Sequence, residues 1–431
     1  MDSLDLCHFG WDGCTIPTDL KDICSHLPTW KNLKTLRNPL ITTKKELHFP
    51  WKFIKNADGE NCMPCYYLGS AIDDGGYANI YKAQRAIYKP ASDNITGTVK
   101  LVKSEPFQEI CIKEIKLIIT PEEEACSDKT EREKIYENEI MAILYEAFIH
   151  AILQKTLERE NHSSAVPNLF EIVGTTQTGE LPNCPTDFNS IWIGMEFLNG
   201  NTLERFLENN LIAVANTTSP SIAQQVSILH NEALIIDTLI QLAFFLNLLQ
   251  DKLRFNHRDL KLNNLFVRHH PAGDGWLRKL GDWTCQNDIV IIDFGFSCIA
   301  CGKGFIRPRA TLVGAGSWYS SEDDCMKYGR DLGQFLYSLH CAFPLQLYVS
   351  PQLFDILHRA LVAEVDGLCV DMMMGLQEDG RPKSGTKLPA RTDYNYGIYI
   401  FLKNKSLEIP GCNPMTFMTE LNKYRTLRES V

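Results

Sequence analysis

The sequence predicts an α+β protein in which buried strands and long helices both contribute to the core. Apolar runs of strand length occur at residues 66–72, 110–113 and 289–292, and apolar residues recur at helical spacing over residues 131–157. With 431 residues, the chain is long enough to bury one large two-lobed domain or two ordinary domains. Its 44% hydrophobic and 22% charged residues are typical of a globular protein.

The bulk composition narrows the classes of function. The formal net charge of −10 argues against a nucleic-acid partner, because a phosphate backbone rewards a surplus of lysine and arginine. No apolar run reaches the roughly 18 residues that a membrane span needs. The acidic start of the chain lacks the basic and apolar regions of a signal peptide. We therefore expect an intracellular protein that is not secreted and has no transmembrane segment.

The 15 cysteines are numerous for such a chain. In a protein that is not secreted they indicate mostly reduced thiols, buried as small apolar side chains. Cys62/Cys65 and Cys298/Cys301 have C-x-x-C spacing, so a shared zinc site or a redox function are alternatives. The two pairs lie far apart in the sequence and neither has a second pair nearby, which favours incidental cysteines.

Two motifs indicate phosphoryl transfer. Residues 257–264 read H-R-D-L-K-L-N-N, and a D-F-G triplet follows at residues 293–295. Phosphoryl transfer needs a carboxylate, here Asp259, to orient or deprotonate the attacking hydroxyl. It also needs ligands for Mg²⁺, here Asn264 and Asp293, so that charge on the transferred phosphate is neutralised. In both motifs the chain resembles the eukaryotic-type protein kinase superfamily.

The resemblance implies a two-lobed protein kinase fold, with a small β-rich N-lobe and a larger, mainly helical C-lobe. The N-lobe with its hinge would cover residues 66–198, and the C-lobe residues 199–431. Residues 1–65 would be an N-terminal extension. Its tryptophans, among them Trp11 and Trp30, suggest that it packs on the kinase domain, because disordered tails are poor in aromatic residues.

The loop after residues 66–72 corresponds to the kinase glycine-rich loop, whose small residues let backbone N–H groups approach the ATP phosphates. The residues that the resemblance places at the nucleotide are Ile72, Gly75, Gly76 and Ile80. Asp73 and Ala78 replace two of the family's glycines. A carboxylate beside a phosphate site repels the phosphates, so weaker phosphate cover is expected. Taken alone, this loop also fits an ordinary hairpin turn.

A lysine and a glutamate complete the expected nucleotide site of the N-lobe. Lys113 stands where kinases place the lysine that contacts the ATP α/β-phosphates, and Lys116 is its alternative. In kinases a glutamate from the following helix pairs with that lysine. The local sequence favours Glu139, with Glu146 as the alternative.

Residues 190–200 are predicted to form a buried strand that runs into the connector between the lobes. By resemblance, Met195 is the gatekeeper, and Glu196 to Leu198 offer backbone groups to adenine. A mostly apolar helix over residues 234–253 then leads into the catalytic loop. Residues 89–97 and 269–275 are expected to be loop insertions, with the paired histidines of the second at the surface.

Beyond the D-F-G triplet the resemblance weakens. Residues 314–322 align with the segment that ends in A-P-E in kinases, although only the first glycine and the final glutamate are kept. Asp331 begins a helix like the one whose aspartate supports the catalytic-loop backbone. The resemblance covers roughly residues 66 to 340, and its profile is similar to divergent kinases such as the haspin-like group and those of large DNA viruses. A viral member would act in the host cell or the virion.

The sequence thus predicts a serine/threonine protein kinase that uses ATP and Mg²⁺ on protein substrates. Lys261 would stabilise charge on the γ-phosphate, and a lysine at this place is typical of Ser/Thr kinases of the family. The alternatives are a pseudokinase scaffold, a small-molecule kinase of related fold, and a structural protein with an inherited kinase domain. Asp73 and Ala78 favour the pseudokinase, whereas the retention of Lys113, Asp259 and the metal ligands argues against it.

Overall fold

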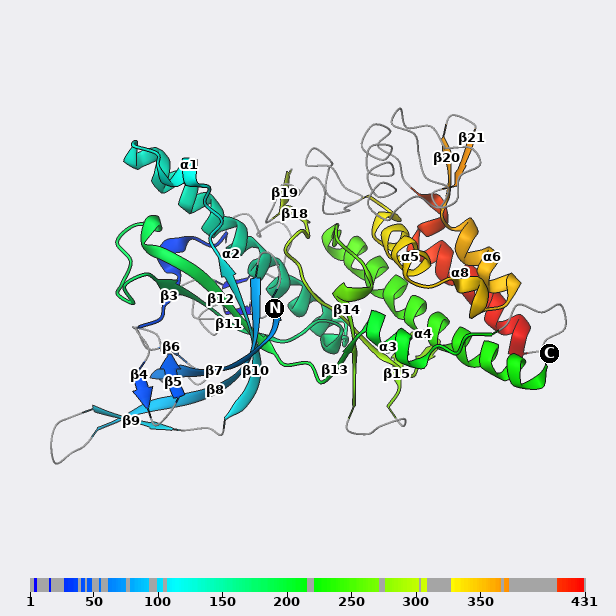
Figure 1. Cartoon of the computed structure of the whole chain (residues 1–431), viewed down its shortest axis with the longest axis horizontal. Helices are drawn as coiled ribbons and strands as arrows, with labels where there is room; N and C mark the ends of the chain where they lie inside the picture. The colour runs from blue at the N-terminus through cyan, green and yellow to red at the C-terminus, as the bar shows by residue number, and fades with distance from the viewer. Residues whose placement is uncertain are drawn as a thin grey trace. The chain divides into compact units, whose positions relative to one another are not determined.

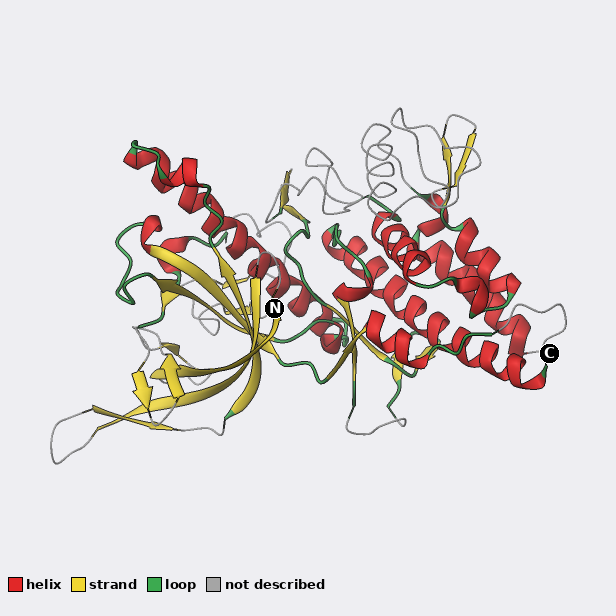
Figure 2. Ribbon diagram, in the orientation of Figure 1, coloured by secondary structure: helices red, strands yellow, loops and turns green. Residues whose placement is uncertain are grey.

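The computed structural model describes most of the chain and divides it between Leu198 and Asn199 into two compact units. The predicted α+β fold is confirmed: the first unit is built on a curled β-sheet, and the second is mainly helical (Figure 2). The residues described are 4–5, 15–16, 27–37, 40–42, 45–48, 54–55, 61–74, 78–92, 99–103, 107–214, 221–270, 276–301, 304–307, 327–365, 368–371 and 409–429.

In its described part, the first unit has one ten-stranded sheet, a separate pair formed by β1 and β2, and a long helix (Figure 1). Its main strand order is β3-β11-β12-β10-β8-β7-β5-β4, antiparallel except for the parallel pair β3 and β11. The strands are β1 (Leu4–Asp5), β2 (Thr15–Ile16), β3 (Lys34–Thr35), β4 (Leu40–Thr42), β5 (Lys45–His48), β6 (Ile54–Lys55), β7 (Asn61–Asp74), β8 (Ala78–Ser92), β9 (Val99–Lys103), β10 (Gln108–Lys116), β11 (Leu169–Thr176) and β12 (Phe188–Glu196). The helices are α1 (Pro121–Glu124) and α2 (Lys129–Arg159).

Strand β10 has two different faces because successive side chains of a strand alternate. Ile110 and Ile112 are fully buried in an apolar cluster that also holds Trp192 of β12. Leu36, from the N-terminal segment, belongs to the same cluster, and Trp30 packs edge-on against Phe188. The segment over residues 27–37 therefore covers this face of the sheet, while the alternate residues of β10 point to the other face.

One strand boundary differs from the sequence prediction. Residues 89–97 were expected to be a loop, but β8 continues to Ser92 and pairs with β9 in register from Tyr88↔Lys103 to Ser92↔Val99. Pro90 lies inside this pairing, opposite Leu101. A proline is tolerated there because the pairing of β8 with β7 ends at Tyr88, so that within the described residues Pro90 has a strand partner on one side only.

The second unit packs helices around α4, which begins at an N-cap Ser221 that forms a capping box with Gln224. Apolar residues of its second half, such as Leu239 and Leu246, are fully buried. The helices are α3 (Leu203–Asn210), α4 (Ile222–Leu253), α5 (Arg330–Ala342), α6 (Pro351–Arg359) and α8 (Pro414–Glu429). The strands are β13 (Gly200–Thr202), β14 (Leu265–Arg268), β15 (Arg278–Leu280), β16 (Trp283–Cys285), β17 (Asp288–Ile291), β18 (Ile299–Cys301), β19 (Gly304–Ile306), β20 (Val362–Val365) and β21 (Leu368–Asp371).

Helices α2 and α4 are, by length and composition, apolar enough to cross a membrane. In each of them most of the apolar window is buried inside the protein, 72% in α2 and 67% in α4. Burial of this kind is what the core helix of a globular domain shows, because its apolar side chains pack against neighbouring elements. The two helices are thus weak indicators of a membrane span.

Candidate functional site

In the first unit, Lys113 of β10 forms an ion pair with Glu146 of α2. The Nζ to Oε1 distance is 2.5 Å, and the two side chains are only 14% and 12% exposed. Helix α2 is fixed at its start by Asp128, whose carboxylate accepts hydrogen bonds from the backbone N–H groups of Thr130 and Glu131. A desolvated charge pair is held more firmly than a surface pair, because water competes less for it.

This pair corrects the assignment of Glu139 as the lysine's partner. Glu139 lies two turns before Glu146 on nearly the same face of α2, because seven residues make almost two full turns. Helical spacing therefore cannot separate the two candidates. Their positions along the helix axis differ by about 10 Å, and the packing of α2 on the sheet places Glu146 beside Lys113.

The residues expected at the hinge lie at the end of β12. Met195 is half-buried and stands opposite Cys111 of β10 in the strand register. The backbone N–H of Glu196 donates to the carbonyl of Asn168, and the Glu196 carboxylate accepts from both the backbone and the side chain of Asn168. The Glu196 N–H is thus paired within the first unit, and the adenine contacts expected of Glu196 to Leu198 stay a prediction.

The expected glycine-rich loop is described only at its flanks. Ile72 ends up 53% exposed on β7, and Ile80 of β8 is half-buried opposite Lys113 in the strand register. Gly75 and Gly76 lie outside the described residues, and so does the side chain of Asp73. The predictions on this loop stay predictions.

In the second unit, two residues of the 257–264 motif converge on the carboxylate of a third, Asp259. Lys261 Nζ lies 2.9 Å and Asn264 Nδ2 lies 3.0 Å from its Oδ2 atom. Asn264 Nδ2 also donates to the Asp259 carbonyl at 2.7 Å. Asp259 and Asn264 are buried, whereas the Lys261 side chain is 43% exposed. The three residues predicted from the motif are therefore brought together, with a lysine head reaching solvent.

Asp331, at the start of α5, holds the backbone before Asp259. Its carboxylate accepts from the N–H groups of His257 and Arg258 and from Nδ2 of Asn256, each at 2.9 Å. These bonds support Arg258 in the left-handed region, at φ 68°. The sequence did not predict a supporting role for Asn256, and its position directly before the 257–264 motif was the one signal for it.

The turn before Asp331 requires glycine. Gly329 has φ 76°, and a Cβ added there would lie 2.4 Å from the carbonyl oxygen of Ile409. No other residue fits this approach without a shift of the backbone. The start of α5, and with it the support for the catalytic loop, thus depends on this position.

Asp293 is tied to the 257–264 motif through its neighbour Ile292. The N–H of Ile292 donates to the carbonyl of Asn264 at 3.0 Å. Asn264 directly precedes β14, Ile292 directly follows β17, and these two strands pair with each other. Asp293 itself is exposed and has φ 65°, a left-handed conformation that is uncommon for an aspartate. Backbone outliers of this kind cluster at functional sites, where the surrounding structure holds them.

The donor chemistry of Asn264 and Asp293 fits Mg²⁺. Among the described residues no group of three or more His, Cys, Asp or Glu side chains is arranged for a metal ion. Mg²⁺ needs fewer, since one or two carboxylates with substrate phosphates and waters hold it in phosphotransferases. The Asn264 amide turns Nδ2 to Asp259, so Oδ1 is the end left for a cation. Oxygen donors are the ligands that Mg²⁺ prefers.

A zinc site shared by the two C-x-x-C pairs has no support in this structure. Cys298 and Cys301 are both disulfide-bonded, which corrects the expectation of reduced thiols at these two positions. Cys62 and Cys65 are buried in separate apolar clusters, because residues three apart in a strand face opposite sides. Four thiolates are therefore not available to one ion.

His150 lies one turn after Glu146 on α2 and makes the first unit sensitive to acid. Burial lowers its pKa from 6.5 to about 4, although its ring Nε2–H donates to the Pro167 carbonyl at 2.7 Å. In the unfolded chain the His150 ring binds a proton near pH 6.5, whereas in the folded chain it binds a proton only near pH 4. The stability that the neutral His150 ring contributes above pH 6.5 is thus lost as the pH falls from 6.5 to about 4.

We expect this histidine to account for up to about 3 kcal/mol of the acid-induced loss of stability by pH 4. Urea unfolding of the wild type and of His150→Gln at pH 7, 6 and 5 measures the difference in slope. Gln keeps an N–H donor but cannot be protonated. Equal slopes for the two proteins would contradict the assignment.

The whole sequence was compared with known proteins. No protein-family model matches this chain, and no curated protein matches it significantly in sequence. What the chain does must therefore be inferred from its own residues: the Lys113–Glu146 pair in one unit, and the group formed by Asp259, Lys261 and Asn264 in the other.

Proposed function

We propose that the protein is a protein kinase that transfers the γ-phosphate of ATP to serine or threonine hydroxyls of proteins. The observation that carries the proposal is the convergence of Lys261 and Asn264 on the Asp259 carboxylate, in a loop whose backbone Asp331 holds. A buried carboxylate beside a lysine and a carboxamide has the groups that phosphoryl transfer needs at the attacking hydroxyl. The two-lobed kinase fold and the membership of the kinase superfamily belong to the same proposal.

In the proposed reaction, the substrate hydroxyl oxygen forms a bond to the γ-phosphorus while the bond from that phosphorus to the β,γ-bridging oxygen breaks. The hydroxyl proton passes to the Asp259 carboxylate, and ADP leaves. Lys261, with its exposed head, stabilises charge on the transferred phosphate. Lys113, steadied by Glu146, orients the α- and β-phosphates.

Asn264 and Asp293 would hold Mg²⁺, which supplies positive charge to the phosphates when it is bound. The chain's own contribution is to keep these two side chains in place. Asn264 is fixed by its bonds to Asp259, and the backbone before Asp293 is fixed by the bond from Ile292 to Asn264.

The test is transfer of labelled γ-phosphate from ATP to a generic protein substrate with Mg²⁺, for the wild type and Asp293→Asn. We expect the variant to lose transfer by roughly 10²-fold or more, since one well-placed electrostatic group is removed. It should also bind nucleotide more weakly in Mg²⁺ than the wild type does, and equally without Mg²⁺.

Two results would point elsewhere. Transfer at the wild-type rate by Asp293→Asn would contradict the proposed metal ligand. A wild type that binds ATP and Mg²⁺ but transfers no phosphate to any protein would instead support the pseudokinase scaffold.

A further inference from the structure

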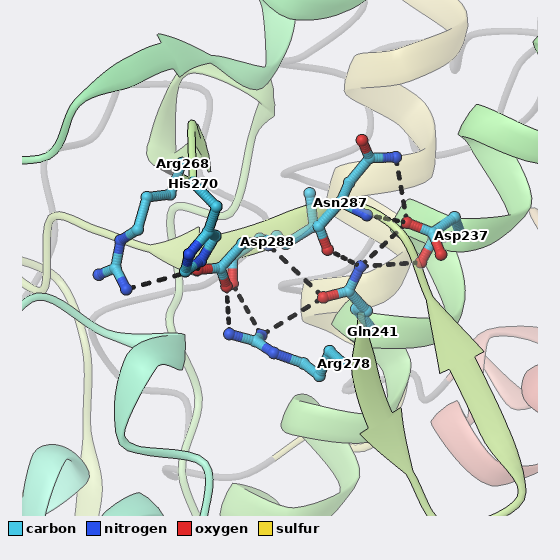
Figure 3. Close-up of polar contacts among 8 residues, drawn as sticks. Asp237, Gln241, Arg268, His270, Arg278, Asn287 and Asp288 are labelled. Carbon is cyan, nitrogen blue, oxygen red and sulfur yellow. Dashed lines mark hydrogen bonds and ion pairs between the residues drawn. The ribbon is translucent and has the colours of Figure 1, made fainter. Parts of the chain in front are cut away.

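A buried charged cluster lies at the far ends of the two strands that lead to Asn264 and Asp293 (Figure 3). We call it the Asp288 cluster. Its elements are α4, the end of β14, the start of β15 and the start of β17. Its members are Asp237, Gln241, Arg268, His270, Arg278 and Asp288.

The Asp288 carboxylate is fully buried and has three basic partners. Arg278, itself 6% exposed, pairs with its Oδ1 atom. His270 Nε2 lies 2.7 Å and Arg268 Nη1 lies 3.4 Å from Oδ2. The His270 ring stacks on Trp276, with 4.4 Å between centroids, so this histidine belongs to a packed cluster and not to the free surface predicted from the sequence. Removing or displacing a buried carboxylate with this many partners lowers the free energy of unfolding strongly, because the charges of its partners stay buried without compensation.

Helix α4 is hydrogen-bonded to the backbone directly before Asp288. Gln241 Nε2 donates to the Asn287 carbonyl at 2.6 Å, and its Oε1 accepts from Arg278 at 3.3 Å. Asp237 accepts from the backbone N–H groups of Gln286 and Asn287 at 2.9 and 3.0 Å. The entry into β17 is thus fastened to α4 by both backbone and side-chain bonds.

The strand register links this cluster to the candidate metal ligands. Arg268 of β14 stands opposite Asp288 of β17, and Leu265 stands opposite Ile291 at the other end. Asn264 directly precedes Leu265, and Asp293 follows β17. Each strand has four residues, so Arg268 and Asp288 lie about 10 Å along the strands from Leu265 and Ile291, which are the strand ends next to Asn264 and Asp293. A slip of one residue would reverse the faces of every side chain in β17.

We propose that Asp288 is a positioning residue: its cluster fixes β17 against β14 and thereby sets the separation between Asn264 and Asp293. This inference rests on the proposed function, because it takes those two side chains as the Mg²⁺ ligands. A buried ion cluster is otherwise a weak source of net stability, whereas it specifies one arrangement of the strands well. The apolar side chains of β17 alone do not select a register, since all four of its residues are buried.

The experiment compares Asp288→Asn with Glu232→Gln in the full chain. Glu232 is a matched control, because it is also a buried carboxylate of the second unit, on α4, and pairs with Arg428 and Tyr424. Both variants should lower the unfolding temperature. The discriminating readout is Mn²⁺ binding, followed by electron paramagnetic resonance in the presence of a non-hydrolysable ATP analogue.

We expect Asp288→Asn to weaken Mn²⁺ binding about tenfold, the lower end of the effect of groups that support metal ligands. Glu232→Gln should leave Mn²⁺ binding unchanged. If Asp288→Asn does not fold, His270→Ala removes one of the three partners at a partly exposed position and should weaken binding by a smaller factor. Unchanged Mn²⁺ binding in the folded variant, or equal weakening by Glu232→Gln, overturns the inference.

Phosphate transfer by the same proteins separates this inference from the proposed function. A wild type that binds Mn²⁺ and nucleotide yet transfers no phosphate refutes the kinase proposal, while the Asp288 comparison keeps its meaning. A wild type that binds no Mn²⁺ with the nucleotide refutes the assignment of Asn264 and Asp293, and with it the positioning role.

Discussion

Asp259→Asn is expected to lower phosphate transfer by roughly 10²-fold or more while the protein stays folded. The substitution removes the carboxylate that would accept the hydroxyl proton, but it preserves the size of the side chain. An asparagine oxygen can still accept the hydrogen bond from Asn264 or from Lys261. The loss should therefore appear in the rate constant at saturating ATP and protein substrate.

The rate is measured with labelled ATP, and circular dichroism with thermal unfolding checks the fold. Asp355→Asn is the matched control, because Asp355 is an exposed aspartate of the same unit, in a surface pair with Arg359. Its rate should equal that of the wild type, since surface pairs contribute little. A wild-type rate in a folded Asp259→Asn variant would refute the proposed role of this residue.

The convergence of Asp259, Lys261 and Asn264 in the second unit could be predicted from sequence, because the motif fixes both residue types and spacing. Asp259, Lys261 and Asn264 lie within one short loop, so their convergence follows from local backbone geometry. The supporting bonds from Asp331 come from a helix far along the chain. That support was expected only through the kinase resemblance, and its geometry follows from the packing of α5.

The Asp288 cluster could not be predicted, because its members come from four elements and follow no spacing rule. His269 and His270 were expected at the surface because no partner ligands sit at zinc spacing; His269 is exposed, as expected, whereas His270 is partly buried. The partners of His270 are Asp288, supplied by a different strand, and Trp276. Contacts of this kind depend on which strands pair, and sequence periodicity reports only which face of an element is apolar.

The start of α4 shows a similar limit. The helix was predicted from residue 234, where the apolar run begins, but it starts at Ile222. Its first turns carry polar residues and exposed apolar ones, such as Ile222 at 81% exposure and Val226 at 59%. The signal for the true start was the capping box formed by Ser221 and Gln224, which fixes a helix end without any apolar periodicity.

The second large effect is expected when the pair of Lys113 and Glu146 is broken, and Glu139 provides the comparison. We expect Lys113→Met and Glu146→Gln each to lower kcat/KM for ATP by roughly 10²-fold, because each breaks the desolvated pair that would orient the phosphates. Glu139→Gln should stay within about twofold of the wild type, since Glu139 lies two turns before Glu146, about 10 Å away along the axis of α2. It is the matched control, being a glutamate on the same face of the same helix.

A double variant tests whether Lys113 and Glu146 act as a unit. If they do, Lys113→Met combined with Glu146→Gln should be no slower than Lys113→Met alone, because the second change removes a partner that has already lost its role. Multiplied losses would mean that the two side chains act separately. A loss in Glu139→Gln as large as that in Glu146→Gln would restore Glu139 as the lysine's partner during turnover, and would show that the pair seen here is not the one that serves the nucleotide.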